Sequence, residues 1–269
     1  MSFEHELEKA KLAALSAKDV ILKHYQTPKI SVSHKSPMQP VTPADIDAND
    51  AIATILRNAF PDDAWLSEES LDDTVRLKKS RVWVIDPLDG TQDFIDKNPE
   101  FTVSIGLVED GKPVVGVICN PVTGELFYGA KGLGAYRNEI KLGVTQNADV
   151  KTVSLLVSKA EFRRGDWDRF KNDFTMTPTG GSAYKLALIG AGHADGCFTL
   201  RAKSEWDICA GHVLIEEAGG VITAADGAPL IYNKRISKFR TIVYSNPFVH
   251  NFILGRICQT PNSPVSSKS

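Results

Sequence analysis

The chain contains Trp83-Val84-Ile85-Asp86-Pro87-Leu88-Asp89-Gly90-Thr91, a stretch that indicates both a local structure and a chemistry. The large apolar residues at its start predict a buried strand. Pro87 predicts the end of that strand, because proline cannot donate a hydrogen bond to a sheet. Asp86 and Asp89 would then project from the strand end and from the turn after it. Two close carboxylates repel each other unless a cation neutralises them, and oxygen ligands on a tight turn suit Mg²⁺.

Gly90 and Thr91 begin a predicted short helical turn directly after these carboxylates. The free N–H groups of such a turn favour an anion such as phosphate. A metal site beside an anion site predicts phosphate chemistry. Asp86 and Asp89 are three positions apart, whereas haloacid-dehalogenase-type phosphatases place a second aspartate two positions after their nucleophile. A water activated by metal is therefore favoured over a phospho-aspartate.

The bulk composition is that of an ordinary globular protein. The 269 residues are 42% hydrophobic and 24% charged, and the net charge of -2 gives no electrostatic case for nucleic-acid binding. No apolar run approaches the length of a membrane helix, and the first residues lack the pattern of a secretory signal. The four scattered cysteines favour reduced thiols. We expect a cytoplasmic protein with a small-molecule partner and with no nucleic-acid or membrane partner.

The first part of the chain, residues 1–145, is expected to form an α+β lobe with helices over an antiparallel sheet. After an opening helix, residues 29–43 hold several prolines and serines and fit either a mobile loop or a hairpin. Thr42 is the expected N-cap of a second helix, which runs to about Asn58.

The second part, residues 146–259, is expected to form an α/β lobe. Helices are expected at 162–173, 182–193 and 207–218, and Gly219-Gly220 ends the last one. Ser182 is the expected cap of the middle one. The final residues, 260–269, are polar and are expected to be disordered.

Three further acidic residues lie at the boundaries of expected elements. Asp45 is in the first turn of the second helix, Glu68 follows a short strand, and Asp207 starts a helix directly after Trp206. An isolated acid at a helix start is most often a cap or a solvated charge. The two aspartates at 86 and 89 therefore carry the metal prediction, and the other three acids are candidates that could join them.

The order of these motifs resembles that of the inositol monophosphatase superfamily, whose members are Mg²⁺-dependent, lithium-sensitive phosphomonoesterases. The matching motifs extend through nearly the whole chain: Val41–Asp45, Ser67–Glu69, Trp83–Thr91 with Phe94, and Glu205–Asp207 followed by Ala210, Gly211 and Ala218–Gly220. The resemblance implies an α+β fold, an alternating αβαβα layered sandwich, and commonly a homodimer.

The resemblance also implies a set of metal ligands. Glu68, Asp86 and the backbone carbonyl of Leu88 would bind one Mg²⁺ ion. Asp86, Asp89 and Asp207 would bind a second ion, with Asp86 bridging the two. The family allows a third, weaker ion near Glu68. The cofactor is therefore expected to be two or three Mg²⁺ ions per chain.

Phosphate binding and water activation are implied in the same way. The backbone N–H groups of Gly90 and Thr91 would hold the phosphate. Glu68 and the Thr91 hydroxyl, the latter linked to Asp45, would position and activate the attacking water. Two cations close together clamp the attacking and leaving oxygens, so no cysteine or histidine nucleophile is needed.

Residues beyond the metal motifs favour the 3′(2′),5′-bisphosphate nucleotidase branch, which removes the 3′-phosphate from adenosine 3′,5′-bisphosphate. Residues 90–105 resemble that branch more than the Asn-Phe-x-His-Gly pattern of inositol monophosphatases. Inositol monophosphatases place an acid seven positions before the Trp-Asp aspartate, where this chain has Leu200. The branch's contacts to the phosphate that is not cleaved resemble Ser182, Lys185 and Arg201.

Alternatives to this substrate stay open. Lys185 and the nearby Lys203 fit solvated surface lysines equally well. An inositol monophosphatase or a broad sugar phosphatase is the alternative enzyme. A non-catalytic role in contact with the transcription machinery is less favoured, because all the expected metal ligands are present.

Overall fold

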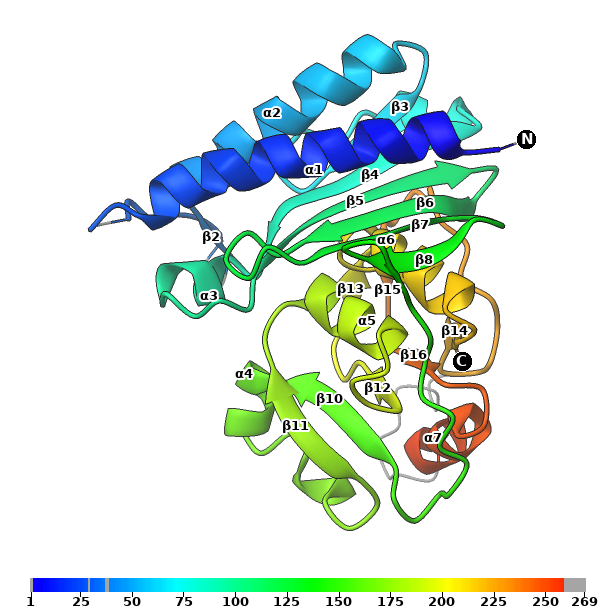
Figure 1. Ribbon diagram of the computed structural model, residues 1–269. Helices are drawn as coiled ribbons and strands as arrows, with labels where there is room; N and C mark the ends of the chain where they lie inside the picture. The colour runs from blue at the N-terminus through cyan, green and yellow to red at the C-terminus, as the bar shows by residue number, and fades with distance from the viewer. Residues whose placement is uncertain (1, 29, 37–38, 259–269) are drawn as a thin grey trace.

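The computed structural model describes residues 2–28, 30–36 and 39–258 (Figure 1). The tail expected to be disordered, 260–269, lies outside the described residues. Within the described ranges, no helix combines the length and the apolar character needed to cross a bilayer. The cysteines are free thiols; Cys258 is exposed and the other three are buried.

Two helices, α1 (Glu4–Tyr25) and α2 (Pro43–Ala59), form the first layer. The segment between them contains the antiparallel strands β1 (Ser33–Ser36) and β2 (Gln39–Val41), so the hairpin alternative for this segment is confirmed. Thr42 is the N-cap of α2, as the sequence predicts.

A seven-stranded sheet lies under these helices, with its strands in sequence order. The first two strands are parallel and all other neighbours are antiparallel. The strands are β3 (Ala64–Ser67), β4 (Arg81–Asp89), β5 (Thr102–Glu109), β6 (Lys112–Cys119), β7 (Leu126–Ala130), β8 (Gly134–Arg137) and β9 (Ile140–Lys141).

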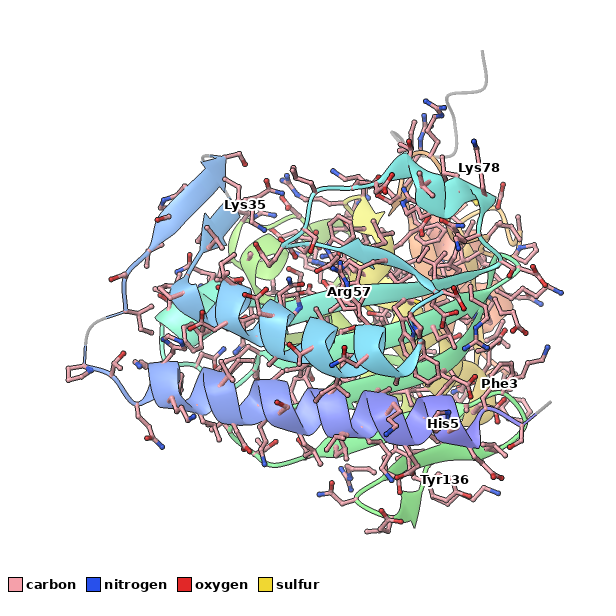
Figure 2. All side chains as sticks on the ribbon, turned by 90° about the horizontal axis from the view of Figure 1, so that it is seen from above. Phe3, His5, Lys35, Arg57, Lys78 and Tyr136 are labelled. Atoms are coloured by element: carbon pink, nitrogen blue, oxygen red, sulfur yellow. The ribbon has the colours of Figure 1, made fainter. Side chains whose placement is uncertain are left out.

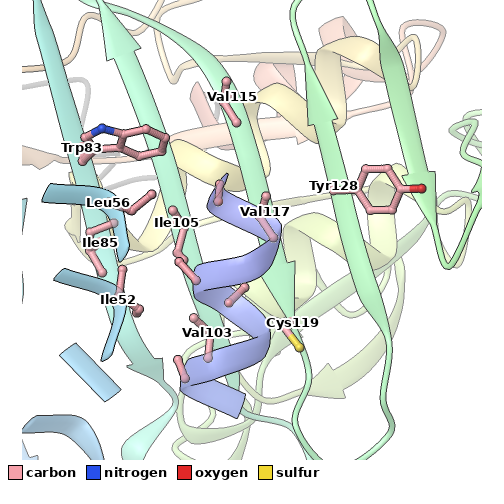
Figure 3. Close-up of a cluster of buried hydrophobic side chains, with 14 of the residues drawn as sticks. Ile52, Leu56, Trp83, Ile85, Val103, Ile105, Val115, Val117, Cys119 and Tyr128 are labelled. Atoms are coloured by element: carbon pink, nitrogen blue, oxygen red, sulfur yellow. The ribbon is translucent and has the colours of Figure 1, made fainter. Parts of the chain in front are cut away.

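Both faces of this sheet are covered, which explains the unbroken apolar run that opens β4. Trp83 and Ile85 face α1 and α2, where they join a core with Ile52 and Leu56 of α2 (Figure 3). The residues between them, such as Val84, face the opposite way and join a second core with residues of later helices. A strand buried on both faces needs apolar side chains at every position.

The predicted end of β4 at Pro87 is wrong. The strand continues to Asp89, with Asp86 opposite Ser104 and Asp89 opposite Thr102. Pro87 and Leu88 therefore lie together opposite one residue of β5, in a bulge. A bulged residue makes no ladder bond, so the missing N–H of proline costs nothing there. The bulge places both aspartates in the strand itself.

The second half of the chain builds a five-stranded mixed sheet and most of the remaining helices. Its strand order is β11-β10-β12-β16-β14. These strands are β10 (Ser154–Ser158), β11 (Thr175–Thr179), β12 (Gly196–Phe198), β14 (Val221–Ala224) and β16 (Ile242–Ser245). The helices are α3 (Thr91–Ile95, from the first half), α4 (Lys159–Arg163), α5 (Ser182–Gly190), α6 (Glu205–Glu217) and α7 (His250–Cys258). A small ladder joins β13 (Lys203–Ser204) to β15 (Lys238–Phe239).

The helix predicted at 162–173 is wrong in its bounds. Ser158 caps an earlier, short helix, α4, and Gly165 adopts a φ of 78°, which interrupts helical structure. A single 3₁₀ turn follows at Asp168–Phe170. Trp167 and Phe170 of this segment pack in a core with residues of the second sheet and α7.

The elements stack in the five alternating layers that the resemblance implies (Figure 1). The order is α1 and α2, the seven-stranded sheet, α5 and α6, the five-stranded sheet, and α7 with its neighbouring segments. The α6 helix packs very closely on the first sheet, because β5 and β6 carry glycine where it crosses. A Cβ atom on Gly116 would lie 2.2 Å from the Ala210 carbonyl oxygen, and one on Gly106 would lie 2.5 Å from the Cys209 sulfur.

This close approach predicts a large effect of a single methyl group. Gly116→Ala should lower the free energy of unfolding by about 2 kcal/mol or more, because backbone on both sides must move. Gly143→Ala is the matched control, since a Cβ atom there meets no atom within 4 Å. Urea unfolding of both variants measures the difference. Equal stability of the two variants would contradict the close packing of α6.

Candidate active site

The predicted carboxylates come together at the end of β4. Oxygen atoms of Glu68, Asp86 and Asp207 all lie within 4.8 Å of one another. Glu68 lies in the loop after β3, Asp86 in β4, and Asp207 in the first turn of α6. The structure thus brings together residues that are far apart in the sequence, from three elements of two layers.

Glu68 is held in place by neighbours on three sides. Its backbone N–H donates to the Ile85 carbonyl at 3.1 Å, which extends the parallel pairing of β3 with β4. The indole N–H of Trp206 donates to its Oε2 at 3.1 Å. The Lys35 ammonium, from the hairpin near the start of α2, donates to its Oε1 at 3.4 Å and also to Glu69 (Figure 2).

Asp86 is the most deeply placed carboxylate of the cluster. Only 2% of its surface is exposed, and its Oδ1 accepts the Leu88 N–H at 3.0 Å. Burial raises the pKa of Asp86 well above its ordinary value, and the negative charges of the nearby carboxylates raise it further. A cation beside a buried acid in this environment strongly stabilises its ionised form.

Asp207 belongs to the carboxylate cluster and also caps the start of α6. It is the third residue of α6, and its Oδ2 accepts the N–H of the N-cap residue Ser204 at 2.9 Å. Burial raises the pKa of Asp207 to about 7; the ammonium of Lys203 lowers it, and Asp89 and Glu68 raise it. The other carboxylate oxygen stays available to the cluster.

Asp89 lies at the edge of this cluster, and its carboxylate faces α5. Its Oδ1 accepts the N–H of Ser182 at 3.1 Å, and its Oδ2 accepts that of Ala183 at 2.8 Å. The prediction that Ser182 caps α5 is therefore wrong: Ser182 is the first helical residue, and Gly181 is the N-cap. The cap is supplied from another part of the chain. Asp89 as a metal ligand stays a prediction.

The expected link between Thr91 and Asp45 is present. The Thr91 hydroxyl donates to Asp45 Oδ1 at 3.0 Å and lies 3.2 Å from the Leu88 carbonyl. The other oxygen of Asp45 accepts the Thr42 N–H at 2.8 Å and its hydroxyl at 2.7 Å, closing the capping box of α2. Burial raises the pKa of Asp45 above its ordinary value, against the effect of these hydrogen bonds.

Gly90 gives the turn after β4 its shape. It is the N-cap of α3 with a φ of 95°, a conformation that glycine adopts without strain. The first N–H groups of a helix have no partner within it. This turn therefore presents N–H donors next to the carboxylate cluster, as a phosphate site requires.

The three predicted substrate contacts differ in their surroundings. Lys185 is buried, and its ammonium donates to the carbonyls of Thr179, Gly180 and Gly181. Burial lowers the pKa of Lys185.

The other two, Arg201 and Ser182, have different partners. Arg201 has 61% of its side-chain surface exposed and its guanidinium lies 3.8 Å from the Asp166 carboxylate. The Ser182 hydroxyl accepts a hydrogen bond from Lys203 at 2.7 Å.

The sequence does not indicate the site contacts of Trp206 and Lys35, and it leaves the role of Lys203 open. In the sequence, Trp206 is notable only as the neighbour of Asp207. A half-buried tryptophan N–H needs an acceptor, but the sequence does not identify that acceptor. Lys35 gave no signal, because its position depends on how the hairpin folds back. Lys203 could not be distinguished from a surface lysine, because only the folded structure brings it to the start of α5.

Comparison with known proteins identifies the family of the chain. A model of the inositol monophosphatase family matches residues 4–260. The chain belongs to this family. It is 32% identical over 257 residues to the fructose-1,6-bisphosphatase/inositol-1-monophosphatase of Aquifex aeolicus, covering 92% of this chain and 93% of that relative.

Two other members of the family are similar over most of the chain. The 3′(2′),5′-bisphosphate nucleotidase CysQ of Salmonella typhimurium is 35% identical over 248 residues, which cover 88% of this chain and 100% of that protein. The solved structure of the inositol monophosphatase from Anabaena (Nostoc) sp. PCC 7120 matches with a TM-score of 0.82 at 32% identity, covering 97% and 98% of the two chains. The predicted superfamily and the layered α+β fold are confirmed.

The raised pKa of Asp207 predicts how Mg²⁺ stabilises this family member at different pH. Without metal, the folded state holds a proton that the unfolded state releases near pH 4, so this group's contribution to stability falls as the pH rises from about 4 to about 7. Mg²⁺ needs the ionised carboxylate. The increase in Tm on adding Mg²⁺ should therefore grow between about pH 5 and about pH 8.

Thermal unfolding with and without Mg²⁺ across this pH range measures the effect. Asp207→Asn is the control, because it removes the titrating group and should flatten the dependence. A Mg²⁺-induced increase in Tm that is the same at every pH would contradict the prediction.

The two roles of Asp89 can be separated by two substitutions. Asp89→Asn keeps one acceptor for α5 and removes a repelling charge, but its NH2 group then faces the other N–H group, so it should lose only part of the stability that Asp89→Ala loses. Asp89→Ala leaves the N–H groups of Ser182 and Ala183 without their acceptor and should lose about 1 kcal/mol more. The predicted role of Asp89 as a metal ligand implies that both variants lose phosphatase activity, because neither retains the carboxylate charge. Urea unfolding and a phosphate-release assay test this; near-normal activity of Asp89→Asn would refute the ligand role.

Proposed function

We propose that the protein is a Mg²⁺-dependent phosphomonoesterase that hydrolyses adenosine 3′,5′-bisphosphate to adenosine 5′-monophosphate and phosphate. Family membership supports a phosphatase. The observation that carries the proposal is the cluster of Glu68, Asp86 and Asp207 beside the turn at Gly90 and Thr91. Such a cluster combines ligands for a cation with donors for an anion.

The donor set fits Mg²⁺. All the converging ligand atoms are carboxylate oxygens, and Mg²⁺ prefers oxygen. Burial and mutual repulsion raise the pKa of Asp86 and of Asp207. A divalent cation would offset both effects, because it stabilises the ionised carboxylates. Glu68, Asp86 and Asp207 would hold the ion, with Asp89 and the Leu88 carbonyl as further ligands. When bound, Mg²⁺ lowers the pKa of a coordinated water and neutralises charge on the phosphate.

The protein's own groups orient the reactants. Because the Thr91 hydroxyl donates to Asp45, its lone pairs face the site and accept a hydrogen bond from the attacking water. Asp45, whose pKa is raised, takes up the proton at Oδ1 through that hydroxyl. The N–H groups of Gly90 and Thr91 hold the phosphate oxygens. The water oxygen bonds to phosphorus as the bond from phosphorus to the ribose 3′-oxygen breaks, and that oxygen takes up a proton from a solvent water.

The surroundings of the leaving group favour a doubly charged substrate over a polyol. Leu200 packs against the outer core of the second sheet and offers no hydrogen bond to a sugar hydroxyl. Lysine and serine side chains at the start of α5 suit a phosphate instead. Inositol monophosphatase is the second candidate, because the Aquifex aeolicus relative that carries both sugar and inositol activities in its name is similar at 32% identity.

A substrate panel tests the proposal. Purified protein should release phosphate with Mg²⁺ from adenosine 3′,5′-bisphosphate with a higher kcat/KM than from inositol 1-phosphate or fructose 1,6-bisphosphate. The Asp207→Asn variant, a chelator and added Li⁺ should each suppress the release. A higher kcat/KM on inositol 1-phosphate would favour the second candidate. No Mg²⁺-dependent release from any of the three esters would overturn the proposal.

A further inference from the structure

Glu100 connects the first half of the chain to two segments of the second sheet. It lies shortly before β5, and its Oε2 accepts the backbone N–H of Gly180 at 2.5 Å. The same oxygen lies 2.5 Å from the ammonium of Lys159, at the start of α4. Gly180 follows β11 and Lys159 follows β10, and these two strands are parallel neighbours. One carboxylate therefore binds both segments where they leave the sheet.

The loop formed by Gly180 and Gly181 packs closely against acidic residues of the first half. A Cβ atom on Gly180 would lie 2.5 Å from Asp93 Oδ2 and 2.8 Å from Glu100 Cβ. A Cβ atom on Gly181 would lie 2.9 Å from Asp89 Oδ2. The absence of side chains at both positions thus allows this close approach. A side chain at either glycine would displace the loop.

The loop in turn determines where α5 starts. Gly181 is the N-cap of this helix, and the next two backbone N–H groups, those of Ser182 and Ala183, donate to the two oxygens of Asp89. The position of the helix start therefore sets the orientation of the Asp89 carboxylate. The negative charge of Asp89 adds to the raised pKa of Asp86, so this carboxylate is close enough to act on the cluster.

Lys159 balances the acidic surroundings of the loop. Burial raises the pKa of Asp93; the positive charge of Lys159 lowers it, and the negative charges of Glu100 and Asp89 raise it. Only 24% of the Lys159 side chain and 28% of the Glu100 side chain are exposed. Salt screens a partly buried pair less than an exposed one. We therefore expect the pair to persist at physiological ionic strength.

We propose that Glu100 is a positioning residue for Asp89. Its carboxylate holds Gly180, the loop of Gly180 and Gly181 places the start of α5, and that start orients the Asp89 carboxylate for the cation. This inference rests on the proposed function, in which Asp89 is a further Mg²⁺ ligand. It gives a role in metal binding to a residue outside the carboxylate cluster.

Calorimetric titration of the metal-free protein with Mg²⁺ tests the inference through the dissociation constant, without substrate. Glu100→Ala should weaken Mg²⁺ binding about five-fold, because the loop loses its acceptor. This is less than the loss of about ten-fold or more that follows removal of a direct hydrogen-bond partner of a ligand. Gly180→Ala should also weaken binding, because its methyl group displaces the loop while Glu100 stays in place.

Two conservative variants separate the hydrogen bond from the charge. Glu100→Gln can still turn a carbonyl oxygen to the Gly180 N–H, and Lys159→Met leaves the Glu100 carboxylate in place. Both should bind Mg²⁺ nearly as tightly as the wild type. If both weaken binding as much as Glu100→Ala does, the charge of the pair matters and not the contact with Gly180, and the inference fails.

Glu217→Ala is the matched control. Glu217 also accepts two glycine N–H groups, those of Gly132 at 2.9 Å and of Gly134 at 2.8 Å, at the turn from β7 to β8. Its removal should lower the Tm and leave the Mg²⁺ dissociation constant unchanged. If Glu217→Ala weakens Mg²⁺ binding as much as Glu100→Ala does, a general loss of stability is the cause, and the inference is overturned.

A double-mutant cycle tests whether Glu100 acts through Asp89. In the Asp89→Asn background, Glu68, Asp86 and Asp207 remain for the cation. Adding Glu100→Ala to this background should cause no further loss of Mg²⁺ affinity. The same additional loss in both backgrounds would contradict the inference.

The outcomes for the inference and for the proposed function are distinct. A wild type that binds Mg²⁺ and releases phosphate, with an unchanged dissociation constant in Glu100→Ala and Gly180→Ala, refutes the positioning role alone. Absence of Mg²⁺ binding by the wild type overturns the positioning role and the proposed function together.

Discussion

Mutual repulsion among buried carboxylates is the constraint on which the site depends, and helix N-termini offset it. Asp45, Asp89 and Asp207 each give at least one oxygen to the first N–H groups of a helix, α2, α5 and α6 respectively. A helix start carries partial positive charge and unsatisfied donors, so it stabilises an acid held against it. These hydrogen bonds oppose the effect of burial, but burial is the larger effect, and the pKa values of Asp45 and Asp207 stay above their ordinary value. Asp86 has no such helix, and its pKa is raised well above its ordinary value.

The layered fold is what makes these helix starts converge. The α6 helix crosses the first sheet at Gly106 and Gly116, where the absence of a side chain brings the helix against the strands. This contact sets the height of Asp207 above the sheet and so its distance from Asp86. The start of α5 is fixed by Asp89 from β4 and by Lys185 from within the helix. Packing of the middle helical layer therefore also positions the residues of the site.

Local sequence signals predicted the parts of the site that depend on local structure. The Thr42 cap and the short helix after Gly90 follow from neighbouring residues, and both are present. Other features depend on long-range contacts that spacing does not contain. The cap of α5 comes from Asp89, more than ninety positions earlier, so Ser182 was the only local candidate. The sequence predicts a strand end at Pro87, because a bulge can be recognised only from the register of the partner strand. The ordered motifs predicted the fold better than the periodicity of apolar residues did, because together they constrain several distant positions of the chain.

The most direct measurement counts the protons that leave when Mg²⁺ binds. Calorimetric titration of the metal-free protein with Mg²⁺ near pH 7, in buffers of different ionisation enthalpy, gives that number. The raised pKa values of Asp86 and Asp207 predict net proton release, and Asp207→Asn should reduce it. Binding without proton release would contradict the crowded, protonated cluster. Absence of any Mg²⁺ binding would contradict the metal site itself.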